Sequence, residues 1–597
     1  MKTRGYMCQN EKKLHYVIPF WVLLLVFYIY IPFRIWDFSP TFEQIEEWIL
    51  CCLYLSISCF GIIFIFLWEK NLKSISVSLI DLVIAVYGIY LIFRSPNLIN
   101  DTECQIRIFT LFLFYLHLRI LPVKYLLAYL FFICLTIVGN LFYEIFLFQN
   151  PWDTTAGIKG LFHNTGLFGN FVGIGVVFSL CALLYKFPFR ILWVILSVFF
   201  LIQLWASTSR ASWVGVLVCA FYLFSVRLFD SKEQALNLKM KVIGSIGIST
   251  ILFIINAIFY FMRPESANGR LYIWRVTMRM FLESPINGIG VNMFRSQYMT
   301  EQAKYLHENP FSLFIMIADE STVPFNEFIR VLTEQGIIGF IIFSFIIWRC
   351  FTISSQAETF SDSKWRIVFT TVFFYLLLIS FFSYPSVYIQ FQIIFLLCIA
   401  ALARFDTQKV ISGSIQKKWI VAGLFSVFLF LISDKSVKHL SYINQWNECL
   451  KSKTYSNTPQ AQKMQLLHKQ LSFNPQFLRT YACTLMREEK YESATAIWKE
   501  LLQKQPSYDA WLQLGICFEK KANYEKAISC WSIASAMIPS RFRPDYLSIQ
   551  TYLKQNDTIK AKQLMQVFLA KEKKVDSPVV DRMRDNIRLL SDSLSSR

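Results

Sequence analysis

The chain has 597 residues, of which 55% are hydrophobic and 17% are charged, and 58 of them are phenylalanine. This composition excludes an ordinary soluble globular protein. The formal net charge of +19 does not predict a nucleic-acid partner, because much of it comes from short basic loops between apolar segments.

Thirteen segments hold about 20 mainly apolar residues each, the length that crosses the hydrocarbon core of a membrane. They are 15–33, 47–68, 74–93, 104–121, 125–148, 165–187, 190–209, 211–229, 240–262, 327–349, 365–384, 387–404 and 419–433. The sequence therefore predicts an all-α fold, a polytopic membrane helix bundle of about thirteen spans.

Basic residues concentrate in every second loop, counted from the N-terminus. They include Lys2, Arg4, Lys12, Lys13, Lys70, Lys73, Arg119, Lys124, Lys186, Arg190, Arg404, Lys409, Lys417 and Lys418. Cytoplasmic loops of membrane proteins carry the excess of lysine and arginine. We therefore expect these loops in the cytoplasm, and the large loop 263–324 and the region after 433 on the outer side.

From about residue 440 the hydropathy falls and a repeat appears. One unit has Trp511, Leu514, Gly515, Phe518, Tyr524, Ala527, Trp531, Ala534 and Pro539, and looser units surround Trp498 and Ala561. This spacing sets large residues against small ones where two helices cross, as in tetratricopeptide repeats. We expect a repeat domain over 440–575 and a polar tail over 576–597. The repeats either bind a protein partner or only cap or dimerise the protein.

Arg210 follows a polar run at the outer end of two predicted spans. Ser209 or Thr208 is the expected N-cap of the next helix, and a helix N-terminus attracts phosphate through its N–H groups. An arginine there can clamp a pyrophosphate. The alternative is an arginine that reaches lipid headgroups.

Arg270, Arg275 and Arg279 lie on an otherwise apolar stretch of the outer loop. If this stretch is an amphipathic helix, Arg275 and Arg279 share a face and are expected to meet lipid headgroups. Arg270 points the other way and can face a site.

The tenth predicted span begins with charged residues. Asn326, Arg330 and Glu334 are spaced by four and share one helix face, with Glu327 beside them. Ionisable residues at membrane depth are costly and by default functional. The alternative is an internal Arg330–Glu334 ion pair. Gly336 and Gly339 predict close helix packing.

The glycine-rich turn 160–170 carries His163 and Asn164 at the outer entrance of the sixth span. Its glycines allow a bent backbone that lines a cavity. His163 is a candidate for a direct role or a hydrogen-bonded structural histidine. No nucleotide, hydrolase or metal-binding motif is present.

Together these pieces resemble the O-antigen ligase and polymerase superfamily, over about residues 150–345. The matching residues are Ser209 to Trp213, Gly269 and Arg270 with Trp274, Pro285 to Gly290 with Phe294, and Asn326 to Phe328 with Glu334, Gly336 and Gly339. The fused repeat domain is similar to longer members found in Bacteroidetes. The resemblance implies a transferase domain over 1–433 in the bacterial inner membrane, with loop 263–324 and the repeats in the periplasm.

By this resemblance the enzyme takes a glycan from undecaprenyl pyrophosphate, without metal or cofactor. It passes the glycan to lipid A core, to a growing glycan or to protein. Membrane lipids surround the enzyme and are further expected partners. Arg210 and Arg270 would hold the pyrophosphate. The family usually has a histidine before the motif asparagine, where this chain has Phe325, so Glu327, Glu334 and His163 become the candidate bases. Asn164, Asn326 and Arg330 are candidate substrate-binding residues. A polysaccharide transporter or flippase, the alternative outside enzymes, would carry charges through several spans.

Overall fold

The computed structural model describes residues 42–68, 74–96, 101–121, 123–147, 162, 164–230, 264–310, 312–354, 360–414, 418–451 and 460–595. The predicted spans 15–33 and 240–262 and the candidate residue His163 lie outside the described residues. Every other predicted span coincides with a helix. These helices are α3 (Phe42–Trp68), α4 (Leu79–Phe93), α5 (Thr102–Ile120), α6 (Val123–Leu147), α7 (Thr165–Leu184), α8 (Arg190–Ala206), α9 (Arg210–Asp230), α13 (Glu327–Ser354), α14 (Phe360–Ser380), α15 (Ile389–Leu402) and α16 (Lys418–Lys451).

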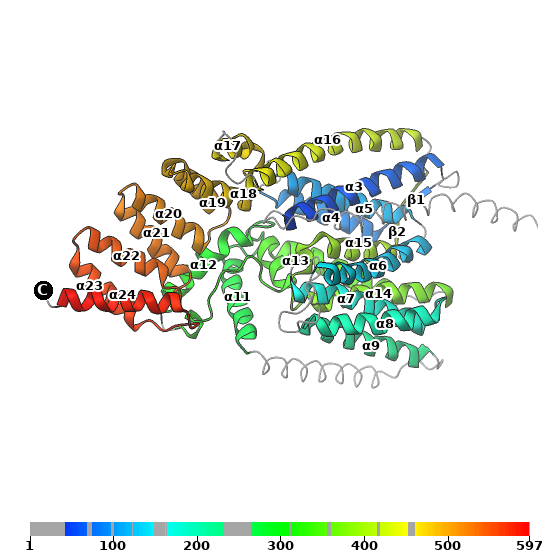
Figure 1. Cartoon of the computed structure of the whole chain (residues 1–597). Coiled ribbons are helices and arrows are strands. Elements are labelled where there is room, and N and C mark those ends of the chain that lie inside the picture. The colour runs from blue at the N-terminus through cyan, green and yellow to red at the C-terminus, as the bar shows by residue number, and fades with distance from the viewer. Residues whose placement is uncertain are drawn as a thin grey trace, which may run out of the picture.

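Two of these helices, α7 and α13, are long and apolar enough to cross a membrane by length and composition. Shorter apolar stretches of 10–17 residues lie within α3, α4, α6, α8, α9 and α15. The helices run side by side as one bundle (Figure 1). The number of spans and their direction stay predictions.

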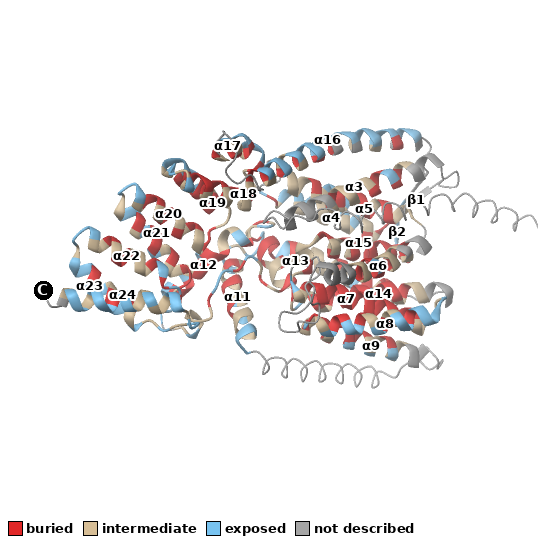
Figure 2. Cartoon of the chain, in the orientation of Figure 1, coloured by how far each residue is buried: buried red, intermediate tan, exposed pale blue. Residues whose placement is uncertain are grey.

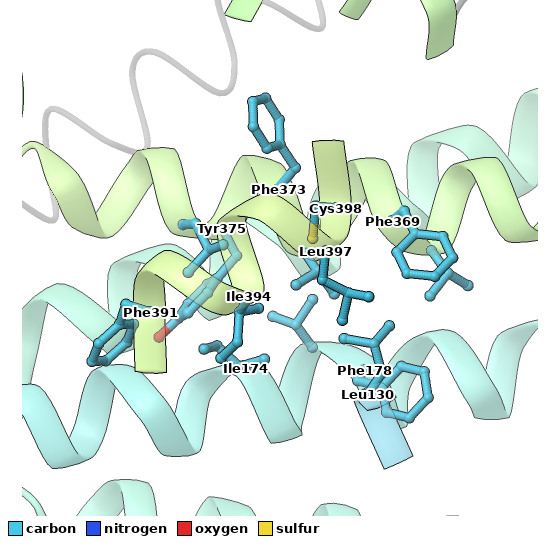
Figure 3. Close-up of a cluster of buried hydrophobic side chains, with 14 of the residues drawn as sticks. Leu130, Ile174, Phe178, Phe369, Phe373, Tyr375, Phe391, Ile394, Leu397 and Cys398 are labelled. Carbon is cyan, nitrogen blue, oxygen red and sulfur yellow. The ribbon is translucent and has the colours of Figure 1, made fainter. Parts of the chain in front are cut away.

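The bundle is apolar inside and, on several helices, apolar outside as well. Ile174 and Phe178 of α7 pack with Phe369 and Tyr375 of α14 in one core (Figure 3). Helices α8 and α16 turn much of their surface outward (Figure 2), and apolar side chains such as Ile191 and Phe430 are exposed there. An apolar exterior fits a lipid environment.

One end of the bundle, called the inner end below, contains loops that the charge pattern predicts to be cytoplasmic. Strands β1 (Ser74–Ser78) and β2 (Lys409–Ser414) pair there as a two-stranded antiparallel sheet, the one departure from an all-α fold in the described residues. The first residues of the predicted span 74–93 are therefore a strand. The helix starts at Leu79, where the Asp81 carboxylate accepts a hydrogen bond from the Ser78 N–H (2.8 Å), one half of a capping box.

At the other end of the bundle, called the outer end below, the predicted outer loop is largely helical. It contains α11 (Pro264–Glu283), α12 (Phe294–Glu308) and a 3-10 turn η2 (Leu313–Ile315). Helix α11 runs crosswise to the bundle helices, between them and the C-terminal helices (Figure 1). A second 3-10 turn, η3 (Pro385–Val387), joins α14 to α15 at this end.

The C-terminal region consists of consecutive helices that pack in sequence order. They are α17 (Gln460–Leu471), α18 (Pro475–Arg487), α19 (Tyr491–Lys504), α20 (Tyr508–Lys520), α21 (Tyr524–Met537), α22 (Arg543–Lys554), α23 (Thr558–Ala570) and α24 (Pro578–Ser595). A Cβ on Gly515 would lie 2.2 Å from the Trp531 Nε1 atom, so the crossing of α20 and α21 needs a glycine. Helix pairs are therefore present, while their assignment to the tetratricopeptide class stays a prediction.

Two expectations for this region need correction. Most of the expected tail is helix α24 (Pro578–Ser595), whose Ile587 is buried against α22 and α23. The transferase domain was expected to end at 433 and the repeat domain to begin at 440, yet both positions lie inside the continuous helix α16. The bundle and the C-terminal helices thus share one helix.

Candidate functional site

Helix α13 is interrupted at Gly336, and this break organises the outer end. Gly336 has φ 68° and ψ −172°, a conformation that is essentially restricted to glycine. A Cβ there would lie 2.2 Å from the Ile286 carbonyl oxygen. The predicted close packing at Gly336 is therefore contact with a loop rather than with a helix. Gly339 does pack closely on a helix, because its Cβ would lie 2.9 Å from the Tyr90 ring of α4.

The turn from Pro285 to Gly290 fills the break in α13. Its Ile289 and Gly290 N–H groups donate to the Thr333 and Glu334 carbonyls (both 2.9 Å). The Ile337 N–H donates to the Pro285 carbonyl (2.9 Å). Arg94 at the end of α4 adds a hydrogen bond from Nη2 to the Gly288 carbonyl (2.7 Å). Groups released by the helix break are thus paired again, and the end of α11 is fixed on α13.

Helix α11 presents Arg270 to the end of the bundle. The Arg270 Nη1 atom donates to the Phe382 carbonyl (2.9 Å), and its guanidinium lies 5.6 Å from the centre of the Phe325 ring. Burial, and then the charge of Arg210, lower the pKa of Arg270, which the nearby Tyr384 partly offsets. Arg210, at the first position of α9, therefore lies close enough to repel it.

The segment 381–388, between α14 and α15, lies beside Arg270. Tyr384 packs edge-on against Phe325 (5.1 Å between ring centres). Its hydroxyl accepts a hydrogen bond from Asn164 Nδ2 (3.2 Å). The Asn164 Oδ1 atom in turn caps α7 by accepting from the Gly166 N–H (2.8 Å). Asn164, a predicted substrate-binding residue, thus joins the start of α7 to the segment that carries Tyr384.

A series of hydrogen bonds between buried polar side chains holds the start of α9, next to Arg210. The Ser209 hydroxyl lies 2.7 Å from that of Ser212, and Ser212 donates to Asn170 Oδ1 (2.7 Å). Asn170 Nδ2 donates to the Ser383 hydroxyl (3.0 Å). Ser209 precedes the helix, as predicted, and its hydroxyl hydrogen-bonds to Ser212 and to the Gly166 carbonyl (3.2 Å). Paired buried polar groups of this kind rigidify their surroundings.

Glu327 and Arg330 pair with each other in the first turn of α13. Arg330 Nη2 lies 2.9 Å from Glu327 Oε2, and Arg330 also hydrogen-bonds the Ser386 hydroxyl. Glu327 Oε1 accepts from the Ser386 N–H (3.0 Å). Both side chains therefore hold the η3 turn. Asn326 caps α13 by accepting from the Ile329 N–H (3.0 Å).

Glu334 has a different partner from the one expected. The prediction of an Arg330–Glu334 ion pair is wrong, because Arg330 pairs instead with Glu327, about one helical turn earlier. The buried Glu334 Oε1 accepts from the Phe294 N–H (3.2 Å) at the start of α12. A carboxylate is favoured at a helix N-terminus, so Glu334 ties α12 to α13.

The face of α11 opposite Arg270 carries Arg275 and Arg279. Arg279 pairs with Glu308 (2.7 Å) and Glu301 (3.2 Å) of α12, partners that the sequence did not predict. Arg275 is exposed on the same side, 5.8 Å from the Tyr305 ring. The two faces of α11 are thus separated as predicted, with Arg270 toward the bundle and Arg279 toward α12.

Sequence reasoning missed Tyr384, Phe382 and Ser383. They lie in a short aromatic and polar interruption between two apolar segments, which could have marked a loop that lines a site. Within the described residues, no three side chains of His, Cys, Asp or Glu gather as metal ligands.

Residues 195–344 match a family model described as O-Antigen ligase. This segment is 150 of the 597 residues and contains Arg210, Arg270, the turn from Pro285 to Gly290 and the break at Gly336. A search of curated proteins found no match. Over the segment that carries both arginines, the chain is similar to the O-antigen ligase family, which supports a membrane location and a glycan transferase of the ligase or polymerase type.

Proposed function

We propose that this protein transfers a glycan from undecaprenyl pyrophosphate to an acceptor at the outer face of the bacterial inner membrane. The observation that carries the proposal is the placement of Arg270, which the Phe382 carbonyl and the Phe325 ring hold at the end of the bundle, inside the segment that matches the O-antigen ligase family model. Arg210, at the start of α9, lies near enough for its charge to lower the pKa of Arg270. Two cations held close together favour a ligand with two negative phosphates.

The proposed role of the arginines is to stabilise the leaving group. When the glycan leaves undecaprenyl pyrophosphate, negative charge develops on the departing phosphate oxygen. Arginines positioned beforehand stabilise that charge without reorganising during the reaction. Arg270 is positioned by the Phe382 carbonyl and the Phe325 ring, and the start of α9 by the serine and asparagine chain.

We assign Glu327 and Glu334 positioning roles instead of the role of base. Glu327 is engaged by Arg330 and the Ser386 N–H, and Glu334 by the Phe294 N–H. A leaving group stabilised in this way needs little help from a base at the acceptor. Asn164, Asn326 and Arg330 then shape the site through the turns that they hold.

Three acceptors fit this chemistry: lipid A core, a growing glycan and protein. Mass spectrometry of lipopolysaccharide, exopolysaccharide and glycoproteins from a deletion strain distinguishes them, because one of the three loses its glycan. The deletion strain should also accumulate the lipid-linked glycan. A strain with all three products unchanged contradicts a transferase. A transporter or flippase would instead leave the lipid-linked glycan on the inner leaflet.

A further inference from the structure

The C-terminal helices are built into the outer loop of the same chain. Apolar residues of α11 and α12 share one buried cluster with residues of α20 and α21. From the outer loop these include Tyr272, Val276, Tyr298 and Met299, and from the C-terminal helices Met537, Ile538, Tyr508 and Trp511. The surface that the repeat pattern offers to a partner is therefore partly covered by α12.

Polar contacts tie the same two parts together. The buried Gln302 of α12 donates from Nε2 to the Met537 carbonyl (2.8 Å). Asp319 lies 3.3 Å from Arg541 and 3.5 Å from Lys574. Burial raises the pKa of Asp319, but the Glu320 N–H and the charges of Lys574 and Arg541 outweigh it and hold the pKa below its ordinary value.

The contact at Asp319 is only a few residues from the site. Along the chain, Pro324 follows, and its carbonyl accepts a hydrogen bond from Trp274 Nε1 of α11 (2.8 Å). The next residue is Phe325, which lies under Arg270 and against Tyr384. Asp319 is thus connected to Arg270 by two routes. One is the backbone to Phe325, and the other runs through Gln302 of α12, whose Nε2 donates to the Asp319 carbonyl (3.2 Å), and on to α11, which packs against α12.

Helix α16 attaches the C-terminal helices to the bundle at a second place. Helix α16 passes from the bundle into them without a break. Its Trp446 is fully buried against Phe477 and donates from Nε1 to the Thr480 hydroxyl (3.1 Å). On the bundle side, Lys435 of α16 donates to Gln105 Oε1 (2.6 Å). The C-terminal helices thus span from α16 to α12 over the outer end.

We propose that the C-terminal helices act on the transfer reaction by positioning Arg270, with this chain's own α12 and Asp319 as the ligand of their surface. The inference rests on the proposed function, because it needs Arg270 to bind the pyrophosphate. Asp319, Arg541 and Lys574 are then positioning residues. A partner that binds the remaining surface of these helices would change the transfer rate through the same contact.

The test uses the full chain in membranes, the lipid-linked glycan extracted from the deletion strain, and release of undecaprenyl pyrophosphate as the readout. Asp319→Lys places a third cation beside Arg541 and Lys574. We expect kcat to fall on the order of fivefold or more, with KM for the lipid-linked glycan changing less. Adding Arg541→Glu and Lys574→Glu should restore most of the rate. The matched control is Asp585→Lys, which reverses one charge of an exposed ion pair on α24 and should leave kcat unchanged.

The same substitution in an Arg270→Lys background separates positioning from general damage. If Asp319 acts through Arg270, Asp319→Lys should add little to the loss that Arg270→Lys already causes. Equal losses in both backgrounds, or a normal rate for Asp319→Lys, would overturn the proposal. Should Asp319→Lys not fold, Asp319→Asn with Lys574→Gln replaces it, with a smaller effect of the same pattern. An active Arg270→Ala variant would instead refute the proposed function itself.

Discussion

Arg119 and Arg349 at one end of the helix bundle and Arg270 at the other end lie in opposite surroundings. At the inner end, Arg119 makes two hydrogen bonds to Asp81 (both 2.7 Å), and Arg349 pairs with Asp406. At the outer end, Arg270 contacts a backbone carbonyl and an aromatic ring, with a second arginine nearby. Among the described residues, no carboxylate lies within ion-pair distance of Arg270. Arg119 and Arg349 are neutralised by carboxylates of the fold, whereas Arg270 is held by a carbonyl and a ring that leave its charge in place.

The largest effect is expected when either Arg210 or Arg270 is replaced. Arg270→Ala or Arg210→Ala should lower the rate of glycan transfer by about a hundredfold, because one preorganised contact to the developing charge is lost. Lysine should restore only part of the rate, since it keeps the charge but loses the two-pronged contact. Transfer is compared in membranes that carry equal amounts of each variant. Arg275→Ala on the exposed face is the control. A dead Arg275→Ala beside a normal Arg270→Ala would show that the wrong face of α11 was assigned.

The next effect concerns how rigidly the outer end is built. Gly336→Ala should destabilise the protein by about 3 kcal/mol, because alanine disfavours this conformation and its Cβ would collide with the Ile286 carbonyl. The matched control is Gly423→Ala in α16, where no atom lies within 4 Å of an added Cβ. There alanine should stabilise the helix by up to about 1 kcal/mol. Thermal unfolding of the purified protein measures both. Equal stabilities would argue against the break in α13.

A smaller effect is expected at the inner end, and of a different kind. Arg119→Met leaves the largely buried Asp81 without its cation, which should cost about 2 kcal/mol of stability. The transfer rate of the folded protein should not change. Asp81→Asn in addition should recover part of the stability, because the unpaired charge is then removed. A large loss of rate in folded Arg119→Met would erase the contrast between the two ends.

The smallest effect is expected at Tyr384, in the segment between α14 and α15 that lies beside Arg270. Tyr384→Phe removes the hydroxyl that accepts from Asn164 but keeps the ring against Phe325. Loss of one hydrogen bond of this kind is worth about 1 kcal/mol, so the transfer rate should fall by a few-fold. The reference variant is Tyr185→Phe, whose hydroxyl lies at the far end of α7. An effect no larger than that of Tyr185→Phe would leave Tyr384 without a role in the site.

Much of the fold follows from hydropathy and spacing, and so do the two arginines. The helices of the bundle coincide with apolar segments, and Arg270 faces opposite Arg279 because helix geometry fixes their relative direction. The partners of the carboxylates could not be predicted this way. A spacing of four favours Arg330–Glu334, but the turn at Ser386 and the start of α12 engage Arg330, Glu327 and Glu334 instead. These contacts come from distant segments, which local spacing does not register. The continuity of α16 was missed because its polar outer half resembles a linker.

The most direct test of the account is the binding of undecaprenyl pyrophosphate to the purified protein in detergent. The account predicts that Arg210→Ala and Arg270→Ala each weaken binding by about tenfold or more. The double variant should lose less than the product of the two, because the arginines share one ligand. Arg119→Met at the inner end should bind as the unaltered protein does. Unchanged affinity in Arg210→Ala and Arg270→Ala would contradict the assignment of a pyrophosphate site at the outer end.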